Sequence, residues 1–466
     1  MMAQSSVSAR GIRRFLPQDI RLTLAEGLGG GREINRSALT ALAIRVAAAG
    51  LGYGTHVVLA RMLGPSEYGI YSYLWVWLTI GGFLASFGLS EAAIRFIAEY
   101  RDTGDSGTSR QFIRSSLAIV STCSFGIAAA GGGILYLLAD QVPAGYMLPA
   151  LLALACLPAF ALQDLLEGHA LSFSWTGLAH VPPYILRQVF IVTFVVALVM
   201  AAQPASAATA MLAVFFAGST ATLIQLVLFL RRAMKALPDQ PGQRRLRHWM
   251  ATAFPMMMTN AFQLVLTFSD IIVLGLFVDS STVALYFAAT RISSQVTAVQ
   301  FAVTSAVAQR MAGLNATSNR QDLRTLIHRS TRWIFWATLA VTAGVIVLGW
   351  PLLWLFGAEF TAAYPVLLIL ATGLLARAST GGAEDALKML GHERAEFGAK
   401  AASVVVNVAL NFGLIPHFGI IGAATATGAS MIVYSVMLEV LMRRRVGMSS
   451  FVGTLGRSQS GPHPSG

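Results

Sequence analysis

Long apolar stretches that follow one another along the whole chain limit what this sequence can fold into. A helix that crosses a bilayer needs about 20 mostly apolar residues, because its backbone groups must be satisfied within the segment. The chain is 55% hydrophobic and only 12% charged, against about 25% charged in soluble domains. The sequence therefore predicts an all-α integral membrane protein of about twelve transmembrane helices, over residues 38–61, 70–89, 112–138, 146–163, 181–202, 206–230, 251–277, 282–308, 331–356, 364–389, 397–416 and 420–442.

The basic residues predict how these helices are oriented. If the N-terminus is cytoplasmic, 28 of the 33 Lys and Arg residues fall on the cytoplasmic side. Cytoplasmic loops of membrane proteins carry an excess of Lys and Arg, so both termini are predicted to be inside. The net charge of +12 is thus explained by the orientation of the helices in the membrane and not by nucleic-acid binding. The basic residues flank apolar runs and do not alternate with aromatic residues that could stack on bases. The opposite side has five short loops without Lys or Arg, near 139–145, 203–205, 278–281, 357–363 and 417–419.

A weak internal repeat predicts two halves. The run VLARMLGPSEYGIY (Val58–Tyr71) aligns with VLGLFVDSSTVALY (Val273–Tyr286) at an offset of 215 residues. Spans one and two would then match spans seven and eight, giving two six-helix lobes that are parallel repeats with a substrate cavity between them. The expected division is a cytoplasmic tail 1–37, an N-lobe 38–230, a basic linker 231–250, a C-lobe 251–443 and a second cytoplasmic tail 444–466.

Four arginines stand inside predicted spans, where a charge costs about 2.5 to 3.5 kcal/mol and calls for a partner or water. Arg45 lies two turns inside span one, and Arg187 follows two prolines near the cytoplasmic end of span five, from where it either faces the cavity or reaches the headgroups. Arg291 is predicted to face a cavity. Arg377 is placed mid-span, two turns from Glu384 and too far for a bridge within one helix. Its partner would be a substrate phosphate, or a carboxylate such as Asp270.

Polar side chains recur at helical spacing in two further spans. Asn260, Gln263, Thr267 and Asp270 form a stripe in span seven, and Asn407 and Asn411 a shorter one in span eleven. Amides suit a sugar, but they also bridge helices in lipid, and both interpretations stay open. The acidic residues Asp270, Glu384 and Asp385 are candidates for coupling to H⁺ or Na⁺.

No cofactor is expected. Cys123 and Cys156 lie in apolar runs without Cys/His spacing for a metal and are predicted to be packing thiols. The glycine runs 29–31 and 131–133 lack the surrounding residues of a phosphate-binding loop.

The run LARMLGPSEYGIYSY (Leu59–Tyr73) resembles the Wzx-type polysaccharide flippases of the multidrug/oligosaccharidyl-lipid/polysaccharide exporter superfamily. Further resemblance lies in Pro255, Asp270 and the LGHER run at Leu390–Arg394. The resemblance implies a bacterial inner-membrane transporter, not an enzyme, with the two-lobed arrangement of the superfamily's multidrug exporters. It also implies a cargo: an oligosaccharide on polyprenyl pyrophosphate, moved to the outer leaflet by alternating access.

The candidate residues follow from that cargo. Guanidinium groups bind phosphate oxygens and stay charged in low dielectric, so the arginines would receive the pyrophosphate and the amides the sugar, while the polyprenyl tail remains among membrane lipids. The alternatives are a cation-coupled multidrug exporter and a membrane glycan polymerase or ligase. The excess of intramembrane arginine argues against the first, and the short outside loops argue against the second. The predicted substrate-binding residues are Arg45, Arg187, Arg291, Arg377, Asn260, Gln263, Asn407 and Asn411.

Overall fold

Helices form nearly all of the part of the chain that the computed structural model describes, residues 32–297 and 320–454. These ranges contain no β-strand, which confirms the all-α prediction. The described residues leave out the outer parts of both predicted tails. They also leave out residues 298–319, which include the end of the eighth apolar stretch and the loop after it. Between α10 and α12, residues 280–297 are helical and are called the 280–297 helix. The other elements are α3 (Arg32–Ala85), α4 (Leu89–Asp102), α5 (Ser106–Leu137), α6 (Ala144–Ser172), α7 (Thr176–Val181), η1 (Pro182–Leu186), α8 (Arg187–Met200), α9 (Ala207–Ala236), α10 (Leu246–Phe277), α12 (Arg320–Trp354), η2 (Ala358–Ala363), α13 (Tyr364–Ala378), α14 (Ala383–Met389), α15 (Glu393–Leu441), η3 (Met442–Val446) and η4 (Val452–Thr454).

Nine helical segments within the described ranges are long and apolar enough to cross a bilayer. Two of them contain a glycine kink, at Gly64 in α3 (φ 74°) and at Gly419 in α15 (φ 53°). Positive φ is open to glycine and strained for other residues. Pro65 directly after Gly64 is suited to restart a helix, because the first N–H groups of a helix have no partner there. Both kinks fall at turns that the sequence predicts.

Two breaks inside predicted spans were missed. The stretch 70–89 ends its helix at Ala85, and α4 begins after Gly88, which packs so closely on α10 that a Cβ would lie 2.3 Å from the Ala253 carbonyl oxygen. The stretch 364–389 divides into α13 and α14 at residues 379–382. There the Gly382 N–H donates to Thr331 Oγ1 of α12 (3.2 Å), so contact with another helix stabilises the break.

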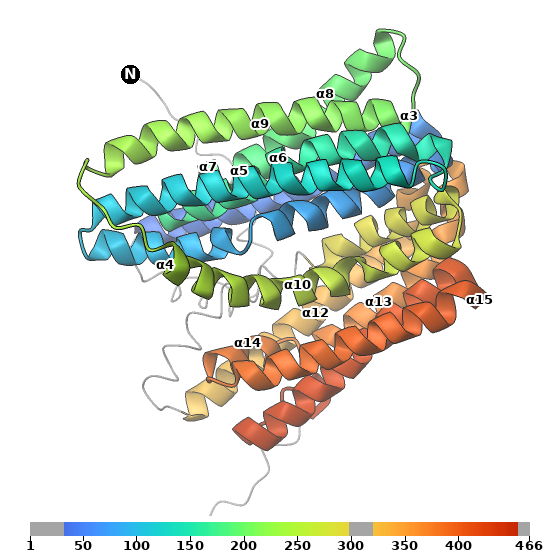
Figure 1. Cartoon of the computed structure of the whole chain (residues 1–466). Coiled ribbons are helices and arrows are strands. Elements are labelled where there is room, and N and C mark those ends of the chain that lie inside the picture. Colours follow the sequence, from blue (N-terminus) through green and yellow to red (C-terminus); the bar gives the residue numbers. More distant parts are fainter. Residues whose placement is uncertain (1–31, 298–319, 455–466) are drawn as a thin grey trace, which may run out of the picture.

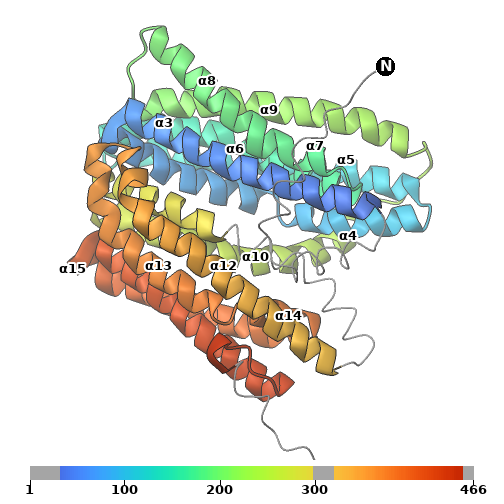
Figure 2. The same cartoon turned by 180° about the vertical axis from the view of Figure 1, so that it is seen from behind.

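The helices gather in two groups that approach each other at one end. The first group, α3–α9, and the second, α12–α15, are closest near the kinks of α3 and α15 and diverge toward α4 and α14 (Figure 1; Figure 2 gives the opposite view). Helix α6 packs against α3, α4, α5 and α9 at the centre of the first group, and α10 packs against α15 while also contacting α3 and α4.

Contacts between α3 and the end of α12 hold the close end together. Arg61 donates from Nε to the Leu355 carbonyl (2.7 Å) and from Nη2 to the Trp354 carbonyl (2.5 Å), and the Tyr53 hydroxyl donates to the Leu352 carbonyl (2.9 Å). The last carbonyls of a helix lack partners within the helix and favour a cation, so Arg61 acts as a cap for α12. Gly69 of α3 also lies against the Ser280 backbone, where a Cβ would find no room. We call these contacts and that of Gly69 with Ser280 the closed end.

Candidate functional site

Arg187 lies at the start of α8, directly after the π-helical turn η1. Its Nη1 donates to Gln163 Oε1 on α6 (2.7 Å), and its guanidinium carbon lies 4.4 Å from the ring centre of Phe160 and 5.6 Å from that of Trp75. The buried Nε has no hydrogen-bond partner among the described residues. Arg187 therefore faces the helices of its own group and keeps donors free.

Arg291 lies on the 280–297 helix with its guanidinium carbon 4.4 Å from the ring centre of Phe287. Its Nε is also buried without a partner in the described part of the chain. Ser294 and Gln295, one turn further along this helix, donate to the backbone carbonyl of Arg291.

A cluster of rings joins the two arginines. The His56 ring centre lies 5.2 Å from Phe287 and 5.9 Å from Trp75, and it lies 6.2 Å from each of Tyr68 and Tyr71. Tyr71 is within electrostatic range of both guanidinium groups. Residues far apart in the sequence thus meet at one buried place, which we call the arginine–aromatic cluster: His56, Tyr68, Tyr71, Trp75, Arg187, Phe287 and Arg291.

The sequence drew attention to only part of this cluster. Arg187 and Arg291 were predicted as substrate-binding residues, and the structure brings them to the same cluster. Tyr68, Tyr71 and Trp75 were missed, because aromatic residues are common in spans and carry no signal comparable to a charge. Tyr68 had one available signal, since it is the tyrosine of the LGPSEYG run.

Of the other predicted substrate residues in α3 and α10, Asn260 and Gln263 make their hydrogen bonds outside the cluster. Arg45 lies in α3, but its side chain is outside the described part of the structure. Asn260 Nδ2 donates to Glu91 Oε1 on α4 (2.6 Å), so this amide bridges two helices. Gln263 accepts a hydrogen bond from Thr267 only through its backbone carbonyl.

Asn407 and Asn411 belong to a buried polar network that also contains Asp270. Asn407 Oδ1 accepts from Ser269 Oγ (2.6 Å) and from Asn411 Nδ2 (3.1 Å). Asp270 Oδ2 accepts from the Tyr286 hydroxyl (2.5 Å) and from Thr427 Oγ1 (3.4 Å). These contacts bridge α10 and α15, and a role for the two amides in binding a sugar stays a prediction.

The placement of Arg377 corrects the sequence interpretation. Because α13 ends at Ala378, Arg377 lies in the last turn of that helix and not in the middle of a span. The break before α14 brings Glu384 back, so that Arg377 Nη2 lies 3.3 Å from Glu384 Oε2. The calculated two-turn separation assumed one continuous helix and was wrong.

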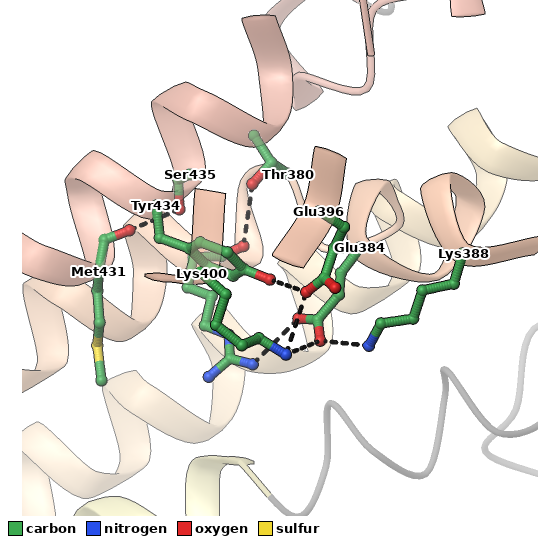
Figure 3. A network of polar contacts seen from close by, with 9 residues as sticks. Thr380, Glu384, Lys388, Glu396, Lys400, Met431, Tyr434 and Ser435 are labelled. Carbon is green, nitrogen blue, oxygen red and sulfur yellow. Dashed lines mark hydrogen bonds and ion pairs between the residues drawn. The ribbon is translucent and has the colours of Figure 1, made fainter. Parts of the chain in front are cut away.

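Glu384 is the centre of an ionic network (Figure 3). Lys388 Nζ lies 2.8 Å and Lys400 Nζ 3.3 Å from its Oε1, and Lys400 also lies 3.1 Å from Glu396. Burial alone would raise the pKa of Glu384, but Arg377, Lys388 and Lys400 together hold it well below its usual range. Burial and the neighbouring Glu384 raise the pKa of Asp385. With three cationic groups around it, Glu384 is compensated by the protein's own side chains.

The described residues contain no group of three or more His, Cys, Asp and Glu side chains placed to hold a metal ion.

Two family models each match more than half of the chain. The "Polysaccharide biosynthesis protein" family matches residues 34–309, and the "Lipid II flippase MurJ" family matches residues 177–456.

Two curated relatives come from Haloferax volcanii. The probable low-salt glycan biosynthesis flippase Agl15 is 29% identical over 169 residues, and the probable flippase AglR is 27% identical over 190 residues. The matches span 36% and 40% of this chain and the same shares of the relatives.

Solved structures share the fold. An inward-facing multidrug resistance MATE family transporter of the MOP superfamily has a TM-score of 0.69 at 14% identity, covering 90% of this chain and 100% of the other. The lipid II flippase MurJ in an inward closed conformation has a TM-score of 0.70 at 14% identity, covering 87% of each chain. The chain belongs to the polysaccharide biosynthesis protein family and shares its fold with solved structures of the MOP superfamily.

Proposed function

We propose that the protein is a flippase that moves a polyprenyl-pyrophosphate-linked oligosaccharide from the inner to the outer leaflet of a bacterial inner membrane. The arginine–aromatic cluster is the observation that carries this proposal. It brings Arg187 and Arg291 together among buried rings, with donors left free on both. Guanidinium forks bind phosphate oxygens with charge-assisted hydrogen bonds and keep their charge when desolvated. Arg45 is proposed to join them from α3.

Twelve spans in two lobes suit this task. Dividing α3 and α15 at their glycine kinks and adding the 280–297 helix brings the nine candidate segments to twelve. The proposed N-lobe is 38–230 and the proposed C-lobe 251–443, with the linker 231–250 and both tails in the cytoplasm. Lys and Arg are concentrated on that side, as in other membrane proteins.

The closed end supports alternating access between these lobes. In the proposed topology Arg61 and Gly69 lie on the outer side, so the contacts with α12 and Ser280 would seal the cavity from outside. The two groups diverge toward α4 and α14 (Figure 1), and this is the side from which the cargo is proposed to enter. The polyprenyl tail can remain in lipid, so only the polar head needs a path through the protein.

Deleting the gene tests the function directly. A strain without the protein should accumulate lipid-linked oligosaccharide in the cytoplasmic leaflet, and a plasmid copy should restore its appearance outside. Arg187→Ala and Arg291→Ala, at matched protein level, should fail to restore it. Normal surface glycan and no accumulated precursor in the deletion strain would contradict the proposal.

Coupling to an ion is a second part of the proposal, and Asp270 is its best candidate. Its carboxylate is buried and is contacted by neutral donors from Tyr286 and Thr427, whereas Glu384 already has three cationic partners. An inside-negative potential favours both the outward movement of the anionic cargo and the inward return of an empty cationic cavity, by about 2.3 kcal/mol per charge per 100 mV. A cation bound at Asp270, or at Asp385, would change the charge balance of that step.

Asp270→Asn is therefore expected to slow turnover while cargo still binds. Proteoliposomes with a clamped potential and separate H⁺ and Na⁺ gradients measure this effect. If the transport rate does not depend on the membrane potential, the H⁺ gradient or the Na⁺ gradient, in the wild type and in Asp270→Asn alike, coupling is excluded.

A further inference from the structure

Three buried side chains of the arginine–aromatic cluster keep polar atoms without a partner. Tyr68 and Tyr71 are 0% exposed and His56 is 4% exposed. The two tyrosine hydroxyls and His56 Nδ1 find no hydrogen-bond partner among the described residues. A buried polar group without a partner carries a free-energy penalty, so three of them in one place point to a ligand that supplies the missing partners.

The free groups are of one chemical kind. Arg187 Nε and Arg291 Nε are donors without acceptor capacity, a tyrosine hydroxyl donates readily, and His56 Nδ1 donates in one of its tautomers. None of the cluster's seven residues is acidic, and Gln163 Oε1, the nearby acceptor, is already bonded to Arg187. A cation finds no carboxylate here and would meet two guanidinium groups, and an uncharged sugar would leave the charge of both guanidinium groups without a counter-charge. A diphosphate, which offers only acceptor oxygens and negative charge, matches the set.

We propose that His56, Tyr68 and Tyr71 complete, with Arg187 and Arg291, a diphosphate-binding pocket in which the tyrosine hydroxyls donate directly to the diphosphate oxygens. This inference rests on the proposed flippase function and deepens it, because it adds binding residues and specifies the part of the cargo that they contact. The hydroxyls are covered in this structure, so the diphosphate reaches them once the rings of α3 and the 280–297 helix move apart.

The pocket also gives the LGPSEYG run a physical role. Gly64 kinks α3, and Tyr68 and Tyr71, one turn apart on the following segment, direct their rings toward His56. Gly69, between them, lies on the Ser280 backbone at the closed end. The same short run thus positions two donors of the pocket and one contact of the closed end.

Replacing each tyrosine by phenylalanine tests the proposal, because the ring stays and only the hydroxyl is lost. Farnesyl pyrophosphate, a soluble isoprenyl diphosphate, is titrated into the purified full-length protein in detergent, and the thermal unfolding temperature is measured without ligand. Tyr68→Phe and Tyr71→Phe should each weaken binding about tenfold, the loss expected for one hydrogen bond to a charged group. Neither should lower the unfolding temperature, since the hydroxyls have no hydrogen-bond partner in the described part of the unliganded chain.

Tyr364→Phe is the matched control. Its hydroxyl donates to the Ile346 carbonyl at 3.0 Å, so this variant should unfold at a lower temperature and bind farnesyl pyrophosphate as the wild type does. Lower unfolding temperatures in Tyr68→Phe and Tyr71→Phe with unchanged affinity would show a structural role and overturn the inference.

The failures of the two proposals can be told apart. If the wild type binds and Arg187→Ala and Arg291→Ala do not, but both phenylalanine variants bind normally, the inference falls while the flippase proposal stands. If the wild type binds no isoprenyl diphosphate at all, both fall. Phosphatidylglycerol, offered as a competitor, distinguishes a diphosphate from a phospholipid headgroup, and displacement by equal concentrations of it would overturn the diphosphate assignment.

Discussion

The expected role of Arg377 depends on its ion pair with Glu384. Its guanidinium and the Glu384 carboxylate are 30% and 20% exposed, so their ion pair should contribute only about 0.5 to 1 kcal/mol to stability. Arg377→Ala is therefore expected to lower the unfolding temperature slightly, because Lys388 and Lys400 still neutralise Glu384. Glycan export per molecule, measured at matched protein level, should stay close to that of the wild type.

Arg291→Ala is the comparison for this prediction. It removes a guanidinium with a free donor from the arginine–aromatic cluster and should abolish export while the protein still accumulates in the membrane. Loss of export in Arg377→Ala at normal stability would show instead that Arg377 contacts the cargo, as the sequence first suggested.

At the scale of helices, the closed end depends on a glycine in α3. A Cβ on Gly69 would lie 1.8 Å from the Ser280 carbonyl oxygen, and a backbone atom cannot move aside without moving its helix. Gly69→Ala should therefore separate α3 from the 280–297 helix and expose the outer end. With Cys123 and Cys156 replaced by Ser, a cysteine introduced at Phe356, which is 1% exposed, should react faster with a membrane-impermeant maleimide added from outside.

Gly54→Ala controls for the general effect of alanine on α3. Gly54 lies in the same helix, and no atom of the described residues, apart from those of its own helix turn, lies within 4 Å of the position that an added methyl group would take, so this variant should leave the labelling rate unchanged. Equal labelling rates in the Gly69→Ala and unsubstituted backgrounds would show that the Gly69 contact does not hold the end closed.

For the whole molecule, the proposed orientation predicts where a fused reporter will be active. A reporter that works only outside the cytoplasm should be active when fused after Gly357, which precedes η2, and silent when fused after Arg245, in the basic segment before α10. The opposite pattern of activity would reverse the topology and would put the closed end on the cytoplasmic side.

The sequence determined those features that depend on neighbours along the chain. A spanning helix satisfies its own backbone, so segment length and hydropathy were enough to predict an all-α membrane protein. The turns at Gly64 and Gly419 are also local features, because the positive φ of each residue favours glycine. The resemblance of the LGPSEYGIY run to Wzx-type flippases is confirmed by the family matches. The twelve spans, the two lobes and the substrate and ion roles of single residues stay predictions.

Tertiary structure alone decided which polar groups meet. The sequence showed that Arg187, Arg291 and Arg377 need partners, but a charge in a span can be satisfied by any helix that packs beside it. The break after Ala378 gave Arg377 a carboxylate, and packing of α3 against the 280–297 helix put Tyr68 beside the Phe287 ring that Arg291 also contacts. These contacts join residues up to about half the chain apart, and no local pattern encodes them because they arise only when helices pack in three dimensions.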